Sequence, residues 1–206
     1  MRSNRTETFT EIARRAQIVD CAIHTIAELG YNQASVRKIA DRVGVAMSVV
    51  LYHFGNKDEL VAAIVAELYR SLIEVMEPVV DAEATAAGKL AAHIRAHCGY
   101  IATHRAHQLA LLEIGSNYRS NAGLRLEQLG VDPAQLAAMS RLELETILTL
   151  GVESGEFRAL SPVSMATAVR GAIGGGLMKV STDPGFDVIA YGEDLVVAFE
   201  LATRQA

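Results

Sequence analysis

The chain has 206 residues, half of them hydrophobic, and a formal net charge of -5 at pH 7. This composition suits one large or two small domains with a proper core. No run of about 18 apolar residues occurs and the start lacks an apolar signal segment, so we expect a cytoplasmic protein without a membrane span. Two distant cysteines, Cys21 and Cys98, argue against a disulfide framework and a zinc finger.

The net charge argues at first against a nucleic-acid partner, but it is unevenly distributed. Residues 1–60 hold eight Lys and Arg against seven Asp and Glu, a balance of +1. Residues 61–206 hold eleven against seventeen, a balance of -6. The charge pattern therefore indicates a division of the chain near residue 60.

Helical spacing of apolar residues predicts four helices in the amino-terminal part. Glycine at helix ends, Ser or Asn at helix starts and a proline at position 78 indicate their bounds. We expect the first to end at Gly30, the second to cover 35–43, the third 47–54 and the fourth 56–76.

The rest of the chain contains longer, alanine- and leucine-rich helical patterns. They extend over about residues 82–103, 107–114, 133–154, 161–180 and 187–204, with a polar connection at 116–132. No β-strand pattern is convincing, so we expect an all-α fold.

The third predicted helix, Met47–Phe54, is apolar on almost every side. At 100° per residue, Val50 and Phe54 share one face, which can close a small core. The opposite face carries four different side chains: Ser48, Val49, Tyr52 and His53.

Two short helices joined by a glycine-containing turn can form a helix-turn-helix, whose second helix enters the major groove of DNA. Ser48 can bond a base or a phosphate, and Val49 can pack on a thymine methyl group. Tyr52 and His53 can bond phosphate oxygens.

Two cations accompany this helix pair. Arg37 can present a bidentate fork to guanine, and Lys57 stands at a helix start, where phosphate is favoured. Helical hairpins with a glycine turn also occur in all-α proteins that do not bind DNA, so the spacing alone leaves that alternative open.

The segment GYNQASVRKIADRVGVAMSVVLYHFGNKDELVAAI, residues 30–64, resembles the signature of the TetR family of bacterial transcription regulators. The resemblance is specific over about residues 12–68 and architectural beyond. It implies an all-α homodimer with a helix-turn-helix DNA-binding domain at residues 1–56. Residues 57–206 would form a helical effector-binding and dimerisation domain. The predicted DNA-binding residues are Ser35, Arg37, Met47, Ser48, Val49, Tyr52, His53 and Lys57.

Three residues depart from the family pattern. Ala46 replaces the usual Ser or Thr, so the third helix loses its N-cap side chain, at about 1 kcal/mol. Met47 stands where many family members have Lys, Arg or a small residue. Leu51 stands where many have an aromatic residue. We therefore expect a more apolar DNA-binding surface and an operator that differs from those of relatives.

A row of side chains follows helical spacing between residues 93 and 107, if that helix is continuous: His93, His97, Tyr100, His104 and His107. Three interpretations are open: a metal site, the polar wall of a ligand pocket, or a solvated face.

The family architecture implies a ligand pocket in the second domain. Candidate ligand-binding residues are His97, Tyr100, His104, Met139, Glu143 and Arg170. Many aliphatic and few aromatic residues favour a mainly apolar effector.

Small residues in the segment 161–180 allow another helix to approach closely. With apolar residues of the last helix they resemble the family's four-helix dimer interface; the candidates are Ala168, Ala172, Gly175, Gly176, Tyr191, Leu195 and Phe199. Close packing within one subunit is the alternative.

The sequence thus predicts a homodimeric repressor that a small-molecule effector releases from a palindromic DNA operator. No enzyme motif, cofactor or metal site is expected, since no HExxH, GxSxG or phosphate-binding glycine loop occurs. The alternatives are an activator and an all-α enzyme that binds a metal through its histidines.

Overall fold

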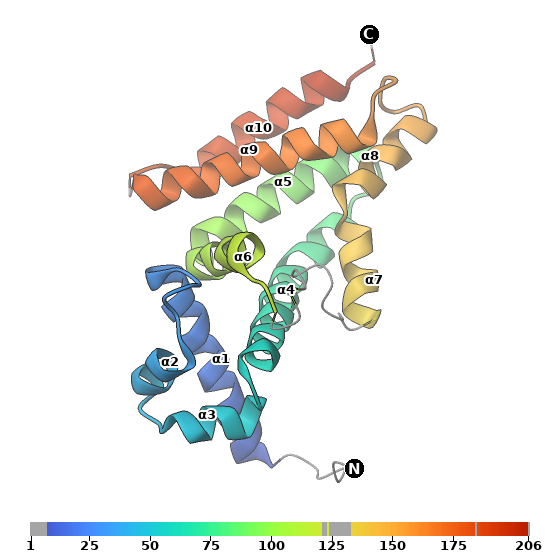
Figure 1. Ribbon diagram of the computed structural model, residues 1–206. Coiled ribbons are helices and arrows are strands. Elements are labelled where there is room, and N and C mark those ends of the chain that lie inside the picture. The colour runs from blue at the N-terminus through green and yellow to red at the C-terminus, as the bar shows by residue number, and fades with distance from the viewer. Residues whose placement is uncertain (1–7, 121–122, 124–132, 184, 206) are drawn as a thin grey trace. The chain divides into compact units, whose positions relative to one another are not determined.

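The computed structural model of the protein describes residues 8–120, 123, 133–183 and 185–205. In this part the chain is helical, which confirms the predicted all-α fold. Figure 1 shows the helices in chain order: α1 (Phe9–Leu29), α2 (Val36–Val43), α3 (Met47–Phe54), α4 (Lys57–Asp81), α5 (Ala86–Thr103), α6 (Arg105–Asn117), α7 (Pro133–Leu142), α8 (Leu144–Glu153), α9 (Pro162–Thr182) and α10 (Val188–Thr203). Within the described ranges, the single extended pairing is an isolated bridge between Phe157 and Arg204.

The described residues group into two compact units. The first lies within Met1–Leu68 and Ala106–Gly130, and the second within Tyr69–Arg105 and Val131–Ala206. Helix α4 therefore contributes to both units, and α6 belongs to the first except for Arg105. The division into functional domains 1–56 and 57–206 stays a prediction, since compactness does not test binding.

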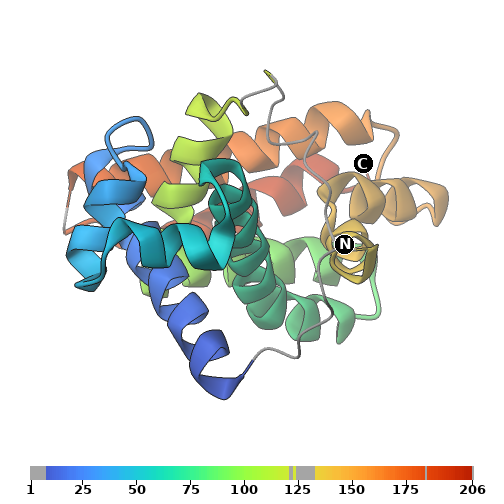
Figure 2. The same cartoon turned by 60° about the horizontal axis from the view of Figure 1, so that its bottom comes forward.

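The first unit is built on α1, against which both α2 and α3 pack (Figure 2). Its buried side chains come from all three helices: Ile18, Ala22, Ile23, Ile26, Ile39, Ala40, Val50 and Phe54. Burial of each large aliphatic or aromatic side chain contributes about 1.5–3 kcal/mol. This small core holds α2 and α3 against α1.

The second unit has α5 at its centre, packed against α8, α9 and α10. Leu90, Ile94 and Ile101 of α5 are at most 2% exposed. Helices α9 and α10 contact each other and run side by side (Figure 1). No described helix is long and apolar enough to cross a lipid bilayer.

Two predicted helix bounds were wrong. Helix α4 continues through Pro78 to Asp81, because the proline removes only one hydrogen bond in the last turns while Met76 and Val80 stay buried. The helix expected over 133–154 is broken at Glu143, whose backbone is extended with φ -66° and ψ 122°. The connection expected over 116–132 lies largely outside the described residues.

Candidate DNA-binding surface and effector site

The turn between α2 and α3 depends on Gly44, whose φ of +76° lies in the left-handed region. Its N–H donates to the carbonyl oxygens of Ala40 and Asp41, which closes the end of α2. At the start of α2, Ser35 Oγ accepts a hydrogen bond of 3.2 Å from the N–H of Lys38. Helix α2 is therefore capped at both ends, and the turn sets the direction of α3.

Helix α3 covers Met47–Phe54, as predicted, and its two sides differ as expected. Val50 and Phe54 are 0% and 1% exposed and face the core. The opposite side is open, with Ser48 exposed and Tyr52 67% exposed, and Met47 beside it is 47% exposed. An apolar and aromatic face thus remains in solvent at the second helix of a helix-turn-helix.

The other predicted DNA contacts lie around this open side. Arg37 is exposed in the first turn of α2, and Val49 and His53 are partly exposed on α3. Lys57 begins α4, where its Nζ lies 4.3 Å from the centre of the Tyr31 ring. Partial burial lowers the pKa of Lys57. This ammonium group is therefore partly engaged within the protein.

The Tyr52 hydroxyl also has a partner in the protein. It donates to Glu11 Oε1 over 3.3 Å at the surface. That distance exceeds the usual 2.7–2.8 Å of an O–H···O bond, so the contact is weak and can be exchanged for another acceptor. The Tyr52 ring meets the His53 ring edge-on, with centroids 5.3 Å apart.

Sequence reasoning missed Arg15, which holds the end of α3. Its guanidinium donates to the His53 carbonyl oxygen at 2.5 Å and lies 4.4 Å from the centre of the Phe54 ring. A cation at a helix carboxyl end is favourable because the last carbonyls lack partners there. No local signal pointed to it, since 38 residues separate Arg15 from His53.

The start of α3 lacks a capping side chain, as the alanine at position 46 predicted. Ala46 occupies the N-cap with φ -66° and ψ 145°, and no side-chain hydrogen bond caps the helix. The backbone is already in the extended conformation that a capping Ser or Thr adopts. Helix α3 is therefore held by its buried face and its carboxyl end rather than by its start.

The row of histidines is not one stripe, because α5 ends earlier than the prediction required. Its last residue is Thr103, and His104 forms the C-cap with φ -125° and ψ 41°. His107 lies on a separate helix, α6. Only His93, His97 and Tyr100 lie within α5 itself.

His93 is the most deeply buried of these histidines, at 7% exposed. Burial, with His97 and Arg170 adding to it, lowers the pKa of His93 to about 3. The ring hydrogen-bonds the backbone of Leu142 at the end of α7, and its Nδ1 has no hydrogen-bond partner. A neutral ring that donates from Nε2 leaves Nδ1 as an acceptor. The predicted ligand set omitted this residue.

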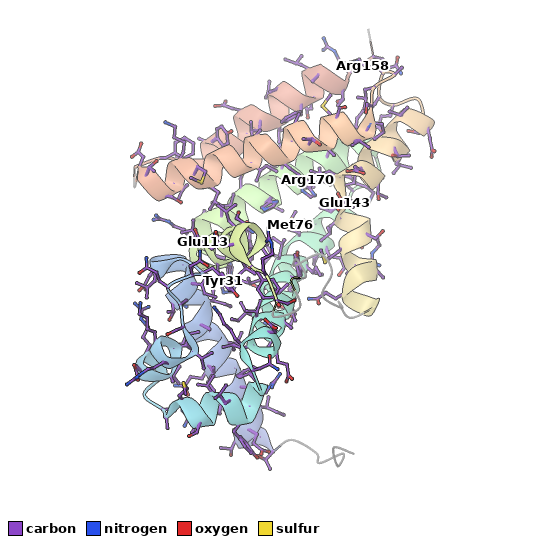
Figure 3. All side chains as sticks on the ribbon, viewed as in Figure 1. Tyr31, Met76, Glu113, Glu143, Arg158 and Arg170 are labelled. Carbon is purple, nitrogen blue, oxygen red and sulfur yellow. The ribbon has the colours of Figure 1, made fainter. Side chains whose placement is uncertain are left out.

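Charged groups meet at the break between α7 and α8. Arg170 of α9 forms ion pairs with Glu143 at the break and with Glu145 in α8, as Figure 3 shows for the labelled Arg170 and Glu143. Its Nη1 lies 3.3 Å from Glu145 Oε1. Two carboxylates thus surround one guanidinium, so this cluster carries a net negative charge.

Met139, also predicted as a ligand contact, is partly exposed on α7.

The remaining predicted ligand residues bond within the protein. Tyr100 is 1% exposed and donates to Ser71 Oγ at 2.9 Å. The His104 ring stacks on the Tyr100 ring, with centroids 4.4 Å apart and planes 5° apart. The structure thus brings His97 near His93 and Arg170 near Glu143, whereas Tyr100 and His104 form a separate stacked pair.

The alternative of a metal-dependent enzyme required a ligand cluster. In the described ranges, no group of three His, Cys, Asp or Glu side chains is arranged to hold a metal ion. His93 and His97 have ring centroids 5.9 Å apart, and no third ligand joins them there. The histidines therefore give this alternative no support.

The predicted dimer residues of α9 and α10 lie in different environments. Gly176 is buried, and a Cβ on it would lie 2.9 Å from Cε1 of Tyr191. The Tyr191 hydroxyl donates to the Ala172 carbonyl oxygen at 2.7 Å. These contacts lie within one subunit. Close packing inside the subunit, the alternative to a dimer interface, therefore explains the glycine at position 176.

The other predicted dimer residues are more open. Ala168 and Gly175 are exposed on α9, and Leu195 and Phe199 are partly exposed on α10. Around them the same helices expose large apolar side chains that the prediction missed, each at least 50% exposed: Val163, Met178, Ile189, Val197 and Leu201.

Sequence comparison connects this arrangement to known proteins. The model of a family described as "Bacterial regulatory proteins, tetR family" matches residues 18–64, from α1 into α4. A fatty acid metabolism regulator protein of Bacillus subtilis is 35% identical over 150 residues, which are 73% of this chain and 74% of that protein. A nicotine-responsive transcriptional repressor of Paenarthrobacter nicotinovorans is 40% identical over 70 residues, 34% of this chain and 36% of the relative.

Solved structures share the fold. The crystal structure of the transcriptional regulator FadR of Bacillus subtilis in complex with stearoyl-CoA matches with a TM-score of 0.66 and 30% identity, over 88% of this chain and 95% of that one. The ketosteroid regulator KstR2 of Mycobacterium tuberculosis matches over 99% of both chains with a TM-score of 0.69 and 19% identity, a likeness of fold alone. Together with the exposed helix-turn-helix, this similarity over most of both chains shows that the protein belongs to the TetR family of bacterial regulatory proteins and is a DNA-binding transcription regulator.

Proposed function

We propose that the protein is a homodimeric repressor that binds a palindromic operator in the cytoplasm and leaves it when a small effector binds. The observation that carries this proposal is the open side of α3. Tyr52 and Met47 stay 67% and 47% exposed on a helix whose other face is buried. Two such helices, related by a two-fold axis, fit half-sites about one turn of DNA apart or somewhat more.

Within each half-site, α3 supplies the base contacts. Ser48 bonds a base or phosphate and Val49 packs on a thymine methyl group. Tyr52 and His53 bond phosphates, and Arg37 binds guanine from α2. Lys57 contributes less than its position predicts, because its ammonium group lies over the Tyr31 ring.

The dimer forms through α9 and α10. Ala168, Gly175 and Met178 follow one another along an exposed side of α9, where small side chains allow a partner helix to approach. Val197 and Leu201 extend this surface on α10, at 56% and 59% exposed. A self-complementary apolar patch of this kind suits a two-fold interface.

The effector is an apolar molecule with a polar end, of the long-chain acyl-CoA class. Support comes from FadR of Bacillus subtilis, which was crystallised with stearoyl-CoA and is 30% identical to this chain. The cluster of His93, Arg170, Glu143 and Glu145 is its polar contact in the second unit. Because Arg170 already faces two carboxylates, the cluster favours a neutral hydrogen-bond donor, such as an amide N–H, over a bare carboxylate.

Selection of bound sequences from a random DNA pool, with the purified full-length protein at a stated salt concentration, tests operator binding. We expect a two-fold symmetric motif, bound by two chains. Titration of that complex with stearoyl-CoA then tests the effector class, with stearate as the control that has the same acyl chain but ends in a bare carboxylate. Release by stearoyl-CoA at lower concentration than by stearate is the expected result.

The outcomes separate the parts of the proposal. Failure to enrich any motif at low salt would overturn operator binding. An enriched motif whose complex resists stearoyl-CoA would leave a DNA-binding regulator with a different effector. Differential affinity for the free and the DNA-bound conformation is what couples the two ligands, so tight binding without release would contradict the proposed switch.

A further inference from the structure

Glu113, near the end of α6, and Tyr118, just after that helix, bond the two ends of the segment that carries α2 and α3. Its amino-terminal end is the turn at Gly30 and Tyr31, and its carboxyl-terminal end is the start of α4 at Lys57 and Asp58. All of these residues belong to the first compact unit. Figure 3 labels Tyr31 and Glu113, which meet at the first of these attachments.

Glu113 makes the attachment at the amino-terminal end. Its Oε2 accepts the backbone N–H of Tyr31 at 3.0 Å and also the Asn117 side-chain amide at 3.2 Å. Gly30 has a φ of +79°, and a Cβ on it would lie 3.2 Å from the same Oε2. The carboxylate can reach this backbone because glycine leaves space for it and adopts the required conformation.

Tyr118 makes the attachment at the other end. It is 0% exposed, and its hydroxyl donates to Asp58 Oδ1 at 3.1 Å. Its ring meets the Tyr31 ring edge-on at 5.9 Å, and Lys57 Nζ lies 4.3 Å from the centre of the Tyr31 ring. The two ends of the segment are thus joined to each other as well as to α6.

This arrangement fixes the helix-turn-helix from outside it. Glu113 and Tyr118 bond residues that flank α2 and α3 in the sequence. Neither Glu113 nor Tyr118 is among the predicted DNA contacts.

We propose that Glu113 and Tyr118 are positioning residues for operator binding, because they hold the two ends of the segment that carries α2 and α3. The inference rests on the proposed operator function and adds two residues that support it. Both residues act on the backbone or side chains that flank the helix pair, not on DNA. Their loss is expected to weaken operator binding in a protein that remains folded.

The experiment uses the full-length protein and the operator recovered by selection with the unmodified chain. Glu113→Ala and Tyr118→Phe each remove one attachment, and Glu113→Gln keeps an acceptor in place. Glu156→Ala is the matched control, since the Glu156 carboxylate accepts backbone N–H groups of Ala86 and Ala87 at 2.7 and 2.9 Å in the second unit.

Glu113→Ala should weaken operator binding roughly tenfold, the order expected from losing one charge-assisted hydrogen bond. Glu113→Gln should restore most of the affinity. Glu156→Ala should lower the thermal midpoint to a similar extent and leave operator affinity unchanged. Affinity is measured well below both midpoints, so loss of folded protein does not contribute.

A second measurement makes the positioning role visible without DNA. Hydrogen exchange at the Tyr31 amide should be faster in Glu113→Ala and normal in Glu156→Ala. Unchanged operator affinity in both Glu113→Ala and Tyr118→Phe would overturn the proposal. That result would leave operator binding itself intact, because the unmodified chain must first have recovered a motif.

Discussion

Helices α3 and α5 both carry a row of polar and aromatic side chains, but the two rows differ in their exposure to solvent. Tyr52 on α3 is 67% exposed, whereas Tyr100 on α5 is 1% exposed and bonds Ser71. The first unit packs α3 against α1 and α2, while α5 meets α8, α9 and α10. The comparison shows that packing on several sides, rather than residue type or spacing, decides how much of such a row is exposed to solvent.

The largest effect should come from a buried residue of α5. Ile94 is 0% exposed, so Ile94→Ala is expected to lower the free energy of unfolding by about 2–5 kcal/mol. Tyr52→Ala on α3 should change it by no more than about 0.5 kcal/mol while weakening DNA binding. Urea unfolding measures both. Equal destabilisation by the two substitutions would remove the contrast between the helices.

The DNA-binding side should respond in affinity rather than stability. Arg37→Ala is expected to weaken operator binding by about 1–3 kcal/mol and to relax the preference at one base pair. Arg95→Ala is the charge-matched control, because Arg95 forms an ion pair with Glu193 in the second unit. Binding is measured against operators changed at each position. Uniform weakening on every sequence would make Arg37 a phosphate contact instead.

The buried histidine of α5 should make stability depend on pH. The pKa of His93 is lowered to about 3, below its usual 6.5, by burial and by the neighbouring His97 and Arg170. Below pH 6.5 the unfolded chain binds a proton that the folded chain does not, so stability falls as the pH falls. From pH 6.5 to pH 5 this contribution is about 2 kcal/mol.

Unfolding of the unmodified chain and of His93→Gln at both pH values isolates this contribution. The difference between the two proteins should shrink by about that amount as the pH falls, because the variant has no imidazole there to titrate. Parallel pH curves would mean that His93 is more accessible to protons than its burial indicates.

The smallest effect should come from the start of α3. Ala46 already has the extended backbone of an N-cap, so Ala46→Ser is expected to add about 1 kcal/mol to the free energy of unfolding. Thermal unfolding measures the gain, and Ala16→Ser, an exposed position within α1, is the control that should not stabilise. A gain in operator affinity without a gain in stability would show that position 46 touches DNA directly.

Local signals predicted most of the fold. The bounds of α2 and α3 followed from Ser35, Gly44 and the Val50–Phe54 face, all of which act within a few residues. The break at Glu143 had no local signal, since the groups that contact it, Arg170 of α9 and the His93 ring at the Leu142 backbone, come from distant parts of the sequence. Pro78 misled the prediction since burial of the last turn outweighed one lost hydrogen bond.

In the candidate sites, too, local features could be predicted and contacts between distant residues could not. The open side of α3 was predictable from eight consecutive residues, and the contacts assigned to it stay predictions until DNA is bound. Arg15 and Glu113 were not predictable, since each acts on a backbone group 38 or 82 residues away. The histidine row failed as a unit because α5 ends at Thr103, before His107 is reached.

Hydrogen exchange of the full-length protein, alone and with its selected operator, tests most directly whether α3 is where DNA binds. Operator should slow exchange in α2, α3 and the start of α4 and leave α5 unchanged. Stearoyl-CoA should then slow exchange in α5 and restore the free rates in α3 as DNA is released. Protection by operator in α5, with none in α3, would contradict the account.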